Sequence, residues 1–378
     1  MTSAMRPWLR RSIMAALVLL VLAALALAEI YQRLGQNYVS AGPAAAAVRI
    51  QVAPGASLRT VLTELAAVGA LREPREVEWY LRLNRLHPRV QAGTYEIPVR
   101  ASPAQILDMF EQGRVILEQL TLVEGATFAD FLELLAAEPD VTHTLAGKTP
   151  AQVMAAIGHP DENPEGHFFP DTYRFAANTA DTVILELAYQ GMQQALDAAW
   201  RERSPELPLS SPYQALILAS MVEKEAQLKT ERARIAGVFV NRLRKGMRLQ
   251  SDPTVIYGLG ARYDGEIHTR DLLSDTPYNT YTRAGLPPTP IALPGRESLI
   301  AAVRPDETGD LYFVATGLGD GAHRFSRSLQ EHNLAVKAYL AQLRRARQRA
   351  RAAAPAGAPS AVPAKPAHVP MQGSGATP

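Results

Sequence analysis

An unbroken apolar run from Ile13 to Ala28 constrains this chain more than any other stretch. The run is slightly shorter than the roughly 20 residues that cross a bilayer straight, but its flanking residues extend it. Arg6, Arg10 and Arg11 precede it, and basic residues on one side of a span predict that this side stays in the cytoplasm. We therefore expect a single-pass transmembrane anchor and an exported remainder. The alternative is a cleaved signal peptide, because Ala26-Leu27-Ala28 resembles an A-x-A cleavage site.

The composition of the chain indicates a globular protein and excludes several kinds of site. Its 378 residues leave room for two or three domains, and 47% of them are hydrophobic. The formal net charge of only +2 gives no general attraction for nucleic acid. The absence of cysteine excludes disulfides, zinc–thiolate sites and a cysteine nucleophile. His323 and His332 are too far apart in sequence for an obvious metal pair, so we expect no metal and no cofactor.

The stretch that begins with Ser211-Pro212 predicts a helix with one acidic group on its apolar side. Serine is a good N-cap, and proline is tolerated at the first helical position. At about 100° per residue, Leu218, Val222 and Glu225 fall on one side of this helix and Glu223 on the other. A carboxyl group against an apolar face is costly to ionise, so we expect a raised pKa for Glu225, as a general acid requires. The alternative is a solvated carboxylate at a frayed helix end.

Residues 48–114 predict a small α/β module between the anchor and the central helix. Val48–Val52 alternates apolar and polar side chains like a strand, and Ser57 is placed to cap a helix. A second helix from about Pro74 and a second strand over Val90–Ile97 complete a strand–helix–helix–strand unit. This order is similar to that of a LysM-like module, a kind of domain that binds chitin-like glycans. A plain α+β spacer is the alternative.

Several loops combine aromatic, amide and hydroxyl side chains, which suits sugar binding because sugar rings stack on aromatic faces and sugar hydroxyls pair with amides. Most glycosidases also need two carboxylates, and Asp252 is the best local candidate for a second one beside Glu225. An enzyme with one carboxyl group can still cleave when the substrate supplies its own nucleophile. The loops concerned are Glu165–Phe175, Met247–Gly258, Thr276–Tyr281 and Gly285–Ile291.

A set of long motifs then resembles one known family, the YceG-like family of endolytic murein transglycosylases (MltG). The resemblance runs in the family's order from the anchor to about Leu343, and Thr289 and Leu293 depart from the usual pattern by replacing an expected Gly and a frequent Asn. The matching motifs are Ala92-Gly-Thr-Tyr95, Val123-Glu-Gly125, Phe169-Pro-Asp-Thr-Tyr173, Ala219-Ser-Met-Val-Glu-Lys-Glu225, Val240-Asn-Arg-Leu243, Met247–Gly258, Tyr278-Asn-Thr-Tyr281, Gly285-Leu-Pro-Pro288 and Glu331-His-Asn333.

The resemblance implies an enzyme of the inner (cytoplasmic) membrane that cuts nascent peptidoglycan strands internally. It is a lyase that cleaves between N-acetylmuramic acid and N-acetylglucosamine and leaves a 1,6-anhydro end, so we expect it to limit strand length beside a peptidoglycan synthase. The catalytic glutamate of the family corresponds to Glu225, the residue that the helical pattern also selects. Glu225 would act as general acid and then as base toward the muramyl C6 hydroxyl. Motif membership gives the expected substrate-binding residues: Glu223, Gln250, Ser251, Asp252, Tyr278, Asn279 and Tyr281.

The expected fold class is α+β, with a transmembrane helix, a small LysM-like module and a mixed catalytic domain whose active-site glutamate lies on a helix. Two alternatives are a muramidase in which Asp252 activates water, and a non-catalytic wall-binding scaffold. The expected division is 1–11 cytoplasmic, 12–32 transmembrane, 33–47 tether, 48–114 LysM-like module, 115–343 periplasmic YceG-like catalytic domain, and 344–378 a disordered tail rich in Arg and then in Ala and Pro.

Overall fold

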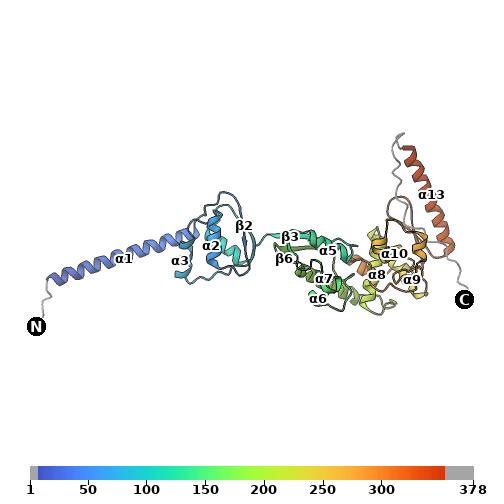
Figure 1. The fold of residues 1–378 in the computed structure, drawn as a ribbon, viewed down its shortest axis with the longest axis horizontal. Helices are drawn as coiled ribbons and strands as arrows, with labels where there is room; N and C mark the ends of the chain where they lie inside the picture. Colours follow the sequence, from blue (N-terminus) through green and yellow to red (C-terminus); the bar gives the residue numbers. More distant parts are fainter. Residues whose placement is uncertain (1–6, 354–378) are drawn as a thin grey trace. The chain divides into compact units, whose positions relative to one another are not determined.

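The computed structural model describes residues 7–353 and divides them into two compact units. The smaller unit comprises the chain up to residue 118 together with 174–179, and the larger comprises 119–173 and the chain from 180 onward. Both contain helices and short strands (Figure 1). The expectation of a mixed α+β chain is confirmed.

The smaller unit contains one antiparallel strand pair packed against helices. In β1 and β2, Val48 lies opposite Ile97 and Val52 opposite Gly93. Apolar residues from both strands meet those of α2, α3 and α4 in one core. The strand–helix–helix–strand order agrees with the sequence pattern, while a LysM-like identity stays a prediction. The elements are α1 (Pro7–Val39), β1 (Val48–Val52), α2 (Leu58–Ala67), α3 (Pro74–Leu83), β2 (Gly93–Ile97) and α4 (Pro103–Glu111).

Helix α1 is the one described helix that is long and apolar enough to cross a membrane. Its candidate span is Arg11–Val39, and the residues of its most apolar window are not buried by protein. The helix continues beyond the expected end of the anchor at residue 32 and ends at Val39. Its last turns pack on the smaller unit, since the Tyr38 ring stacks on that of Tyr80 with centroids 4.5 Å apart. The start of the segment expected as a tether is therefore helical.

The larger unit is mostly helical. The strands form three short pairs, β3 with β5, β4 with β6, and β7 with β8, and the boundary between the units falls within β3 and β5. The elements are β3 (Leu117–Thr121), α5 (Phe128–Ala137), β4 (Val141–Thr142), α6 (Pro150–Ala156), β5 (Thr172–Ala176), β6 (Thr179–Ala180), α7 (Asp181–Arg201), α8 (Pro212–Glu225), α9 (Arg232–Arg244), α10 (Asp252–Leu259), α11 (Thr269–Leu273), α12 (Arg296–Val303), β7 (Tyr312–Ala315), β8 (His323–Ser326) and α13 (Leu329–Ala353).

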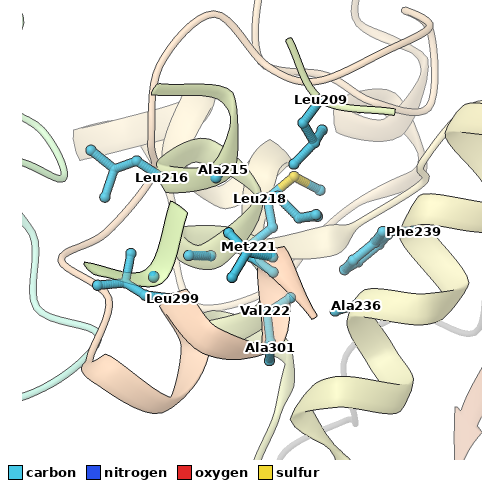
Figure 2. Close-up of a cluster of buried hydrophobic side chains, with 14 of the residues drawn as sticks. Leu209, Ala215, Leu216, Leu218, Met221, Val222, Ala236, Phe239, Leu299 and Ala301 are labelled. Carbon is cyan, nitrogen blue, oxygen red and sulfur yellow. The ribbon is translucent and has the colours of Figure 1, made fainter. Parts of the chain in front are cut away.

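Helix α8 forms the centre of the larger unit. Ser211 caps it as expected, because its side chain accepts a hydrogen bond from the Gln214 N–H. Every residue from Ala215 to Val222 is buried, so the predicted one-sided apolar stripe is wrong. The physical reason is that α7, α9, α10 and α12 all pack against α8 and leave it no solvated face. Figure 2 shows side chains of α8, α9 and α12 meeting in this core.

Helix α13 extends past the expected end of the folded domain at residue 343. Its first half packs through Ala335 and Tyr339 on Val314 of β7. Beyond that contact Arg344, Arg345 and Arg349 are exposed, and the helix continues to Ala353. The first ten residues of the tail expected to be disordered, 344–353, are thus helical. The rest of that tail, 354–378, lies outside the described residues.

Candidate active site

Glu225 is the last residue of α8, where the helix ends with Ala226 as its C-cap. One carboxyl oxygen, Oε1, accepts a hydrogen bond from Ser251 Oγ at 2.6 Å. The residue is half-buried, so it has lost much of its water yet remains open to a ligand. Burial, the largest effect, and the nearby Asp252 raise the pKa of Glu225, the Ser251 hydrogen bond and Arg242 lower it, and the result is a pKa of about 7. The group can therefore carry or release a proton near neutral pH.

Ser251 is held in place by a buried hydroxyl network. Its N–H donates to Thr280 Oγ1 at 3.0 Å, and its carbonyl oxygen accepts from Thr254 Oγ1 at 2.6 Å. The hydroxyls of Thr254 and Thr280 lie 2.9 Å apart. Because Ser251 is 1% exposed, its hydroxyl has little freedom to turn away from Glu225. Ser251 therefore orients the carboxyl group.

Asp252 and Tyr281 form a second pair beside Glu225. Tyr281 Oη donates to Asp252 Oδ1 at 2.5 Å, and burial together with the Asp252 charge raises the pKa of Tyr281. The Tyr281 N–H donates to Asn279 Oδ1 at 2.9 Å. The side-chain amide of Asn279 donates to the carbonyl oxygens of Asp271, Leu272 and Ser274, so Asn279 supports the loop that carries Tyr281.

Arg242 on α9 connects the segment before α10 to the residue that precedes strand β7. Its Nε donates to the Leu311 carbonyl at 2.6 Å and its Nη1 to the Leu249 carbonyl at 2.8 Å. Nη1 also lies 3.3 Å from Gln250 Oε1, and Gln250 has a φ of 51°. Because Arg242 is buried, its positive charge acts on Glu225 through a poorly screened environment. Arg242 was not among the predicted site residues, although it lies in the Val240–Leu243 motif.

The structure gives the remaining two predicted residues, Glu223 and Tyr278, hydrogen-bond partners other than Glu225. Glu223 accepts from Arg232 Nη2 at 2.7 Å and from the Gly295 N–H at 3.0 Å, so both of its oxygens are used in packing. Tyr278 Oη lies 2.8 Å from Thr289 Oγ1. Of the seven residues predicted to bind substrate, Ser251 contacts Glu225 directly, Asp252 acts on it electrostatically, and Tyr281 holds Asp252.

The comparison with known proteins agrees with the motifs. The sequence matches the YceG-like family over residues 50–338, which is more than half of the chain. The chain belongs to the YceG-like family. The resemblance expected from the motifs is therefore confirmed.

Relatives of this YceG-like chain include proteins named endolytic murein transglycosylase. The one from Bacillus subtilis (strain 168) is 31% identical over 313 residues, covering 78% of this chain and 85% of that protein. The one from Streptococcus pneumoniae (strain D39) is 25% identical over 326 residues, and the match covers 78% of this chain and 58% of that protein. A crystal structure of a yceG-like protein from Listeria monocytogenes is 28% identical, covers 76% of this chain and 98% of that one, and has a TM-score of 0.48.

A second buried carboxyl group of this YceG-like protein, Glu165, was not singled out from the sequence. Burial raises its pKa to about 7, as for Glu225. Its oxygens accept from the Phe128 N–H at 3.1 Å and from Tyr257 Oη at 3.0 Å. Glu165 is only 4% exposed, whereas Glu225 is half-buried. Exposure thus favours Glu225 as the group that meets a substrate, and Glu165 as a support for α5 and α10.

The histidines considered as metal ligands have protein partners. His323 Nδ1 lies 2.8 Å from Glu231 Oε2, and the ring of His332 stacks on that of Tyr312. Among residues 7–353, no group of three or more His, Cys, Asp or Glu side chains is arranged to hold a metal ion.

Proposed function

We propose that this YceG-like protein is an endolytic lytic transglycosylase that cleaves peptidoglycan between N-acetylmuramic acid and N-acetylglucosamine. The observation that carries the proposal is Glu225, a half-buried carboxyl group with a pKa near neutrality that Ser251 orients. The name of the relatives, endolytic murein transglycosylase, supports the same reaction class. The products would carry 1,6-anhydro-N-acetylmuramic ends.

In this mechanism a single carboxyl group acts twice. Ser251 donates to Oε1, which leaves Oε2 as the oxygen that carries the proton of neutral Glu225. Oε2 gives that proton to the glycosidic oxygen while the bond from this oxygen to C1 of the muramyl ring breaks. The resulting carboxylate then takes the proton of the muramyl C6 hydroxyl as its oxygen bonds to C1. Water is not consumed, so the reaction is that of a lyase.

Asp252 would stabilise the positive charge that develops at C1 while the glycosidic bond breaks. Its carboxylate lies close enough to Glu225 to raise the pKa of that group, and therefore close to the reacting atoms. Tyr281 donates to Oδ1 and fixes the orientation of the carboxylate. A muramidase would instead use Asp252 to activate water. The two mechanisms therefore differ in the role of this residue.

The deciding experiment is mass spectrometry of peptidoglycan strands digested by the full-length protein. The proposal predicts 1,6-anhydro products from the wild type and no new strand ends from Glu225→Gln, which keeps the shape of the side chain but cannot donate the same proton. Products heavier by one water with reducing ends would support the muramidase. Strand binding without new ends from the wild type would support a wall-binding scaffold.

We extend the proposal to the setting of the enzyme. The arginines before the apolar run and the lipid-compatible surface of α1 support a single-pass anchor with a cytoplasmic N-terminus. The larger unit would then act on nascent strands in the periplasm and limit their length beside a peptidoglycan synthase. The strand–helix–helix–strand order of the smaller unit supports a LysM-like glycan-binding role over residues 48–114, with the catalytic domain over 115–343.

A further inference from the structure

A hollow of about 480 Å³ lies at the N-terminal end of α8, the end opposite to Glu225. Its walls come from the segment before α8, the first turns of α8, one residue of α9 and the loop 285–288. Ser211, Tyr213 and Gln214 supply polar groups, and Leu243, Leu286 and Pro287 supply apolar surface. None of the described residues that line it has a charged side chain.

The hollow and Glu225 lie on the same line of one helix. Gln214 and Glu225 are separated by eleven residues of α8, which is close to three full turns at 3.6 residues per turn. The two positions therefore point in nearly the same direction, at a spacing of about 16 Å along the axis. The middle of α8 between them is buried, so a polymer that reaches both places must cross the loop beside the helix and not follow α8 itself.

The loop between Thr276 and Pro288 connects the two places. It carries Tyr281, which binds Asp252 beside Glu225, and four residues later Gly285 begins the wall of the hollow. On the other wall, the half-buried ring of Tyr213 stacks on His167 with centroids 5.8 Å apart. An aromatic ring held in this way offers a fixed face to a sugar ring.

We propose that this hollow is a second subsite for the glycan strand, which binds an amino sugar at a distance from the bond that is cleaved. The inference rests on the proposed function and extends it. A neutral sugar with an apolar ring face and polar edges matches a mixed, uncharged lining. An anionic ligand such as a phospholipid headgroup would find no cation there. Gln214 Oε1 accepts from the Ser210 N–H at 2.8 Å, so its Nε2 is the donor left for a sugar hydroxyl or acetamido oxygen.

Gln214→Glu tests the subsite with little change to the fold. The variant keeps an acceptor for the Ser210 N–H, and a carboxylate in the first turn of a helix is favourable. It removes the Nε2 donor and places a charge in an uncharged hollow. Gln330→Glu is the matched control, because Gln330 is an exposed residue in the first turn of α13.

The first measurement is kcat/KM of the full-length protein on long uncrosslinked strands and on a tetrasaccharide, which extends only two sugars to either side of the scissile bond. We expect Gln214→Glu to lower kcat/KM about tenfold on long strands, as the loss of one hydrogen bond predicts, and to leave the tetrasaccharide unchanged. Equal losses on both substrates, no loss on either, or the same loss in Gln330→Glu would overturn the subsite.

The second measurement separates the subsite from the proposed reaction. Binding of long strands is measured in Glu225→Gln with and without Gln214→Glu, so that it does not depend on cleavage. A tenfold weaker binding with the added substitution supports the subsite even if the wild type cleaves nothing, an outcome that would refute only the reaction. Unchanged binding would overturn the subsite.

Discussion

At the scale of single residues, two neighbours in sequence act in opposite directions on the proton affinity of Glu225. Ser251 stabilises the carboxylate through its hydrogen bond and lowers the pKa, whereas the negative charge of Asp252 raises it. Burial adds a larger upward shift. The pKa of about 7 is thus a balance that substitution can move either way.

Ser251→Ala and Asp252→Asn should shift the pH profile of cleavage in opposite directions. The acid step needs protonated Glu225, so kcat/KM of the wild type should be level below about pH 7 and fall roughly tenfold per pH unit above it. Ser251→Ala removes a hydrogen bond that favours the carboxylate, so the pKa rises and the fall moves to higher pH. Asp252→Asn removes a repelling charge, so the pKa drops and the fall moves to lower pH.

The measurement is kcat/KM on uncrosslinked strands from pH 5 to 9 for the wild type and both variants. Both variants should also be slower at the plateau, Ser251→Ala because Glu225 is less well oriented and Asp252→Asn because C1 loses an anion. Shifts of the same sign in the two variants would contradict this assignment of their effects.

Glu165 should make the protein less stable as the pH rises. Its folded-state pKa of about 7 is above the ordinary value of 4.5, so between these values the unfolded chain loses a proton that the folded chain keeps. Stability therefore falls across this window and levels off above about pH 7. For a buried group the full effect is about 3 kcal/mol.

Glu165→Gln should reduce by about that amount the difference in unfolding free energy between pH 4.5 and pH 8. The amide can still accept from the Phe128 N–H and can donate to Tyr257 Oη. Chemical denaturation of the full chain at a series of pH values checks this. Glu186→Gln, on the exposed side of α7, is the control. An equal pH dependence in Glu165→Gln and the wild type would refute the role of Glu165.

At the scale of elements, the sequence predicts features that depend on neighbouring residues and does not predict contacts between distant segments. Ser211 caps α8 as predicted because a cap needs only the next three residues. The one-sided stripe was wrong because local periodicity does not show how many helices surround α8. Glu225 was selected all the same, but its partner Ser251 comes from 26 residues away and became a candidate only through a family motif.

The burial of Glu165 could not be predicted from its neighbours in sequence. Its partners Phe128 and Tyr257 are 37 and 92 residues away in sequence. Nothing in the local segment Glu165–Phe175 distinguishes a buried carboxyl group from a solvated one. The order of the smaller unit was predictable for the opposite reason, since local signals such as the Ser57 cap of α2 mark its elements.

Arg232 on α9 forms ion pairs with residues of α8 and α12. Its substitution should show that Glu223 stabilises the fold and does not bind substrate. Its guanidinium lies 2.7 Å from both Glu223 on α8 and Glu297 on α12, and 3.3 Å from Glu124. Arg232 and Glu223 side chains are 7% and 5% exposed. Arg232→Met should destabilise the protein by about 3–5 kcal/mol, because Glu223 becomes a buried charge without a cation.

The double variant Arg232→Met with Glu223→Gln tests that reason directly. Neutralising Glu223 should recover part of the lost stability in urea denaturation of the full chain. Glu223→Gln alone should lower stability while leaving KM for glycan strands unchanged, because the side chain faces Arg232 and Gly295. A rise in KM without loss of stability would instead indicate that Glu223 contacts the substrate.

At the scale of the whole molecule, the proposed anchor would decide which compartment each unit can serve. Helix α1 ends by packing on the smaller unit, so this unit begins directly where the candidate span ends. Under the proposed anchoring, such a chain would act on substrate made at the same membrane surface. The direction of α1 across the membrane therefore matters as much as the site itself.

The absence of cysteine makes that direction testable with single-cysteine variants. Ala4→Cys lies before α1, and Ala261→Cys lies at an exposed position of the larger unit. Three arginines before the apolar run predict that residue 4 stays in the cytoplasm. In spheroplasts a membrane-impermeant maleimide should label Ala261→Cys at once and Ala4→Cys only after lysis. The reverse pattern would contradict the proposed orientation.

The same variant tests the signal-peptide alternative. If the protein expressed from the Ala4→Cys gene stays unlabelled after lysis and its mass is lower by that of residues 1–28, the segment was cleaved after Ala28 and is a signal peptide, not an anchor.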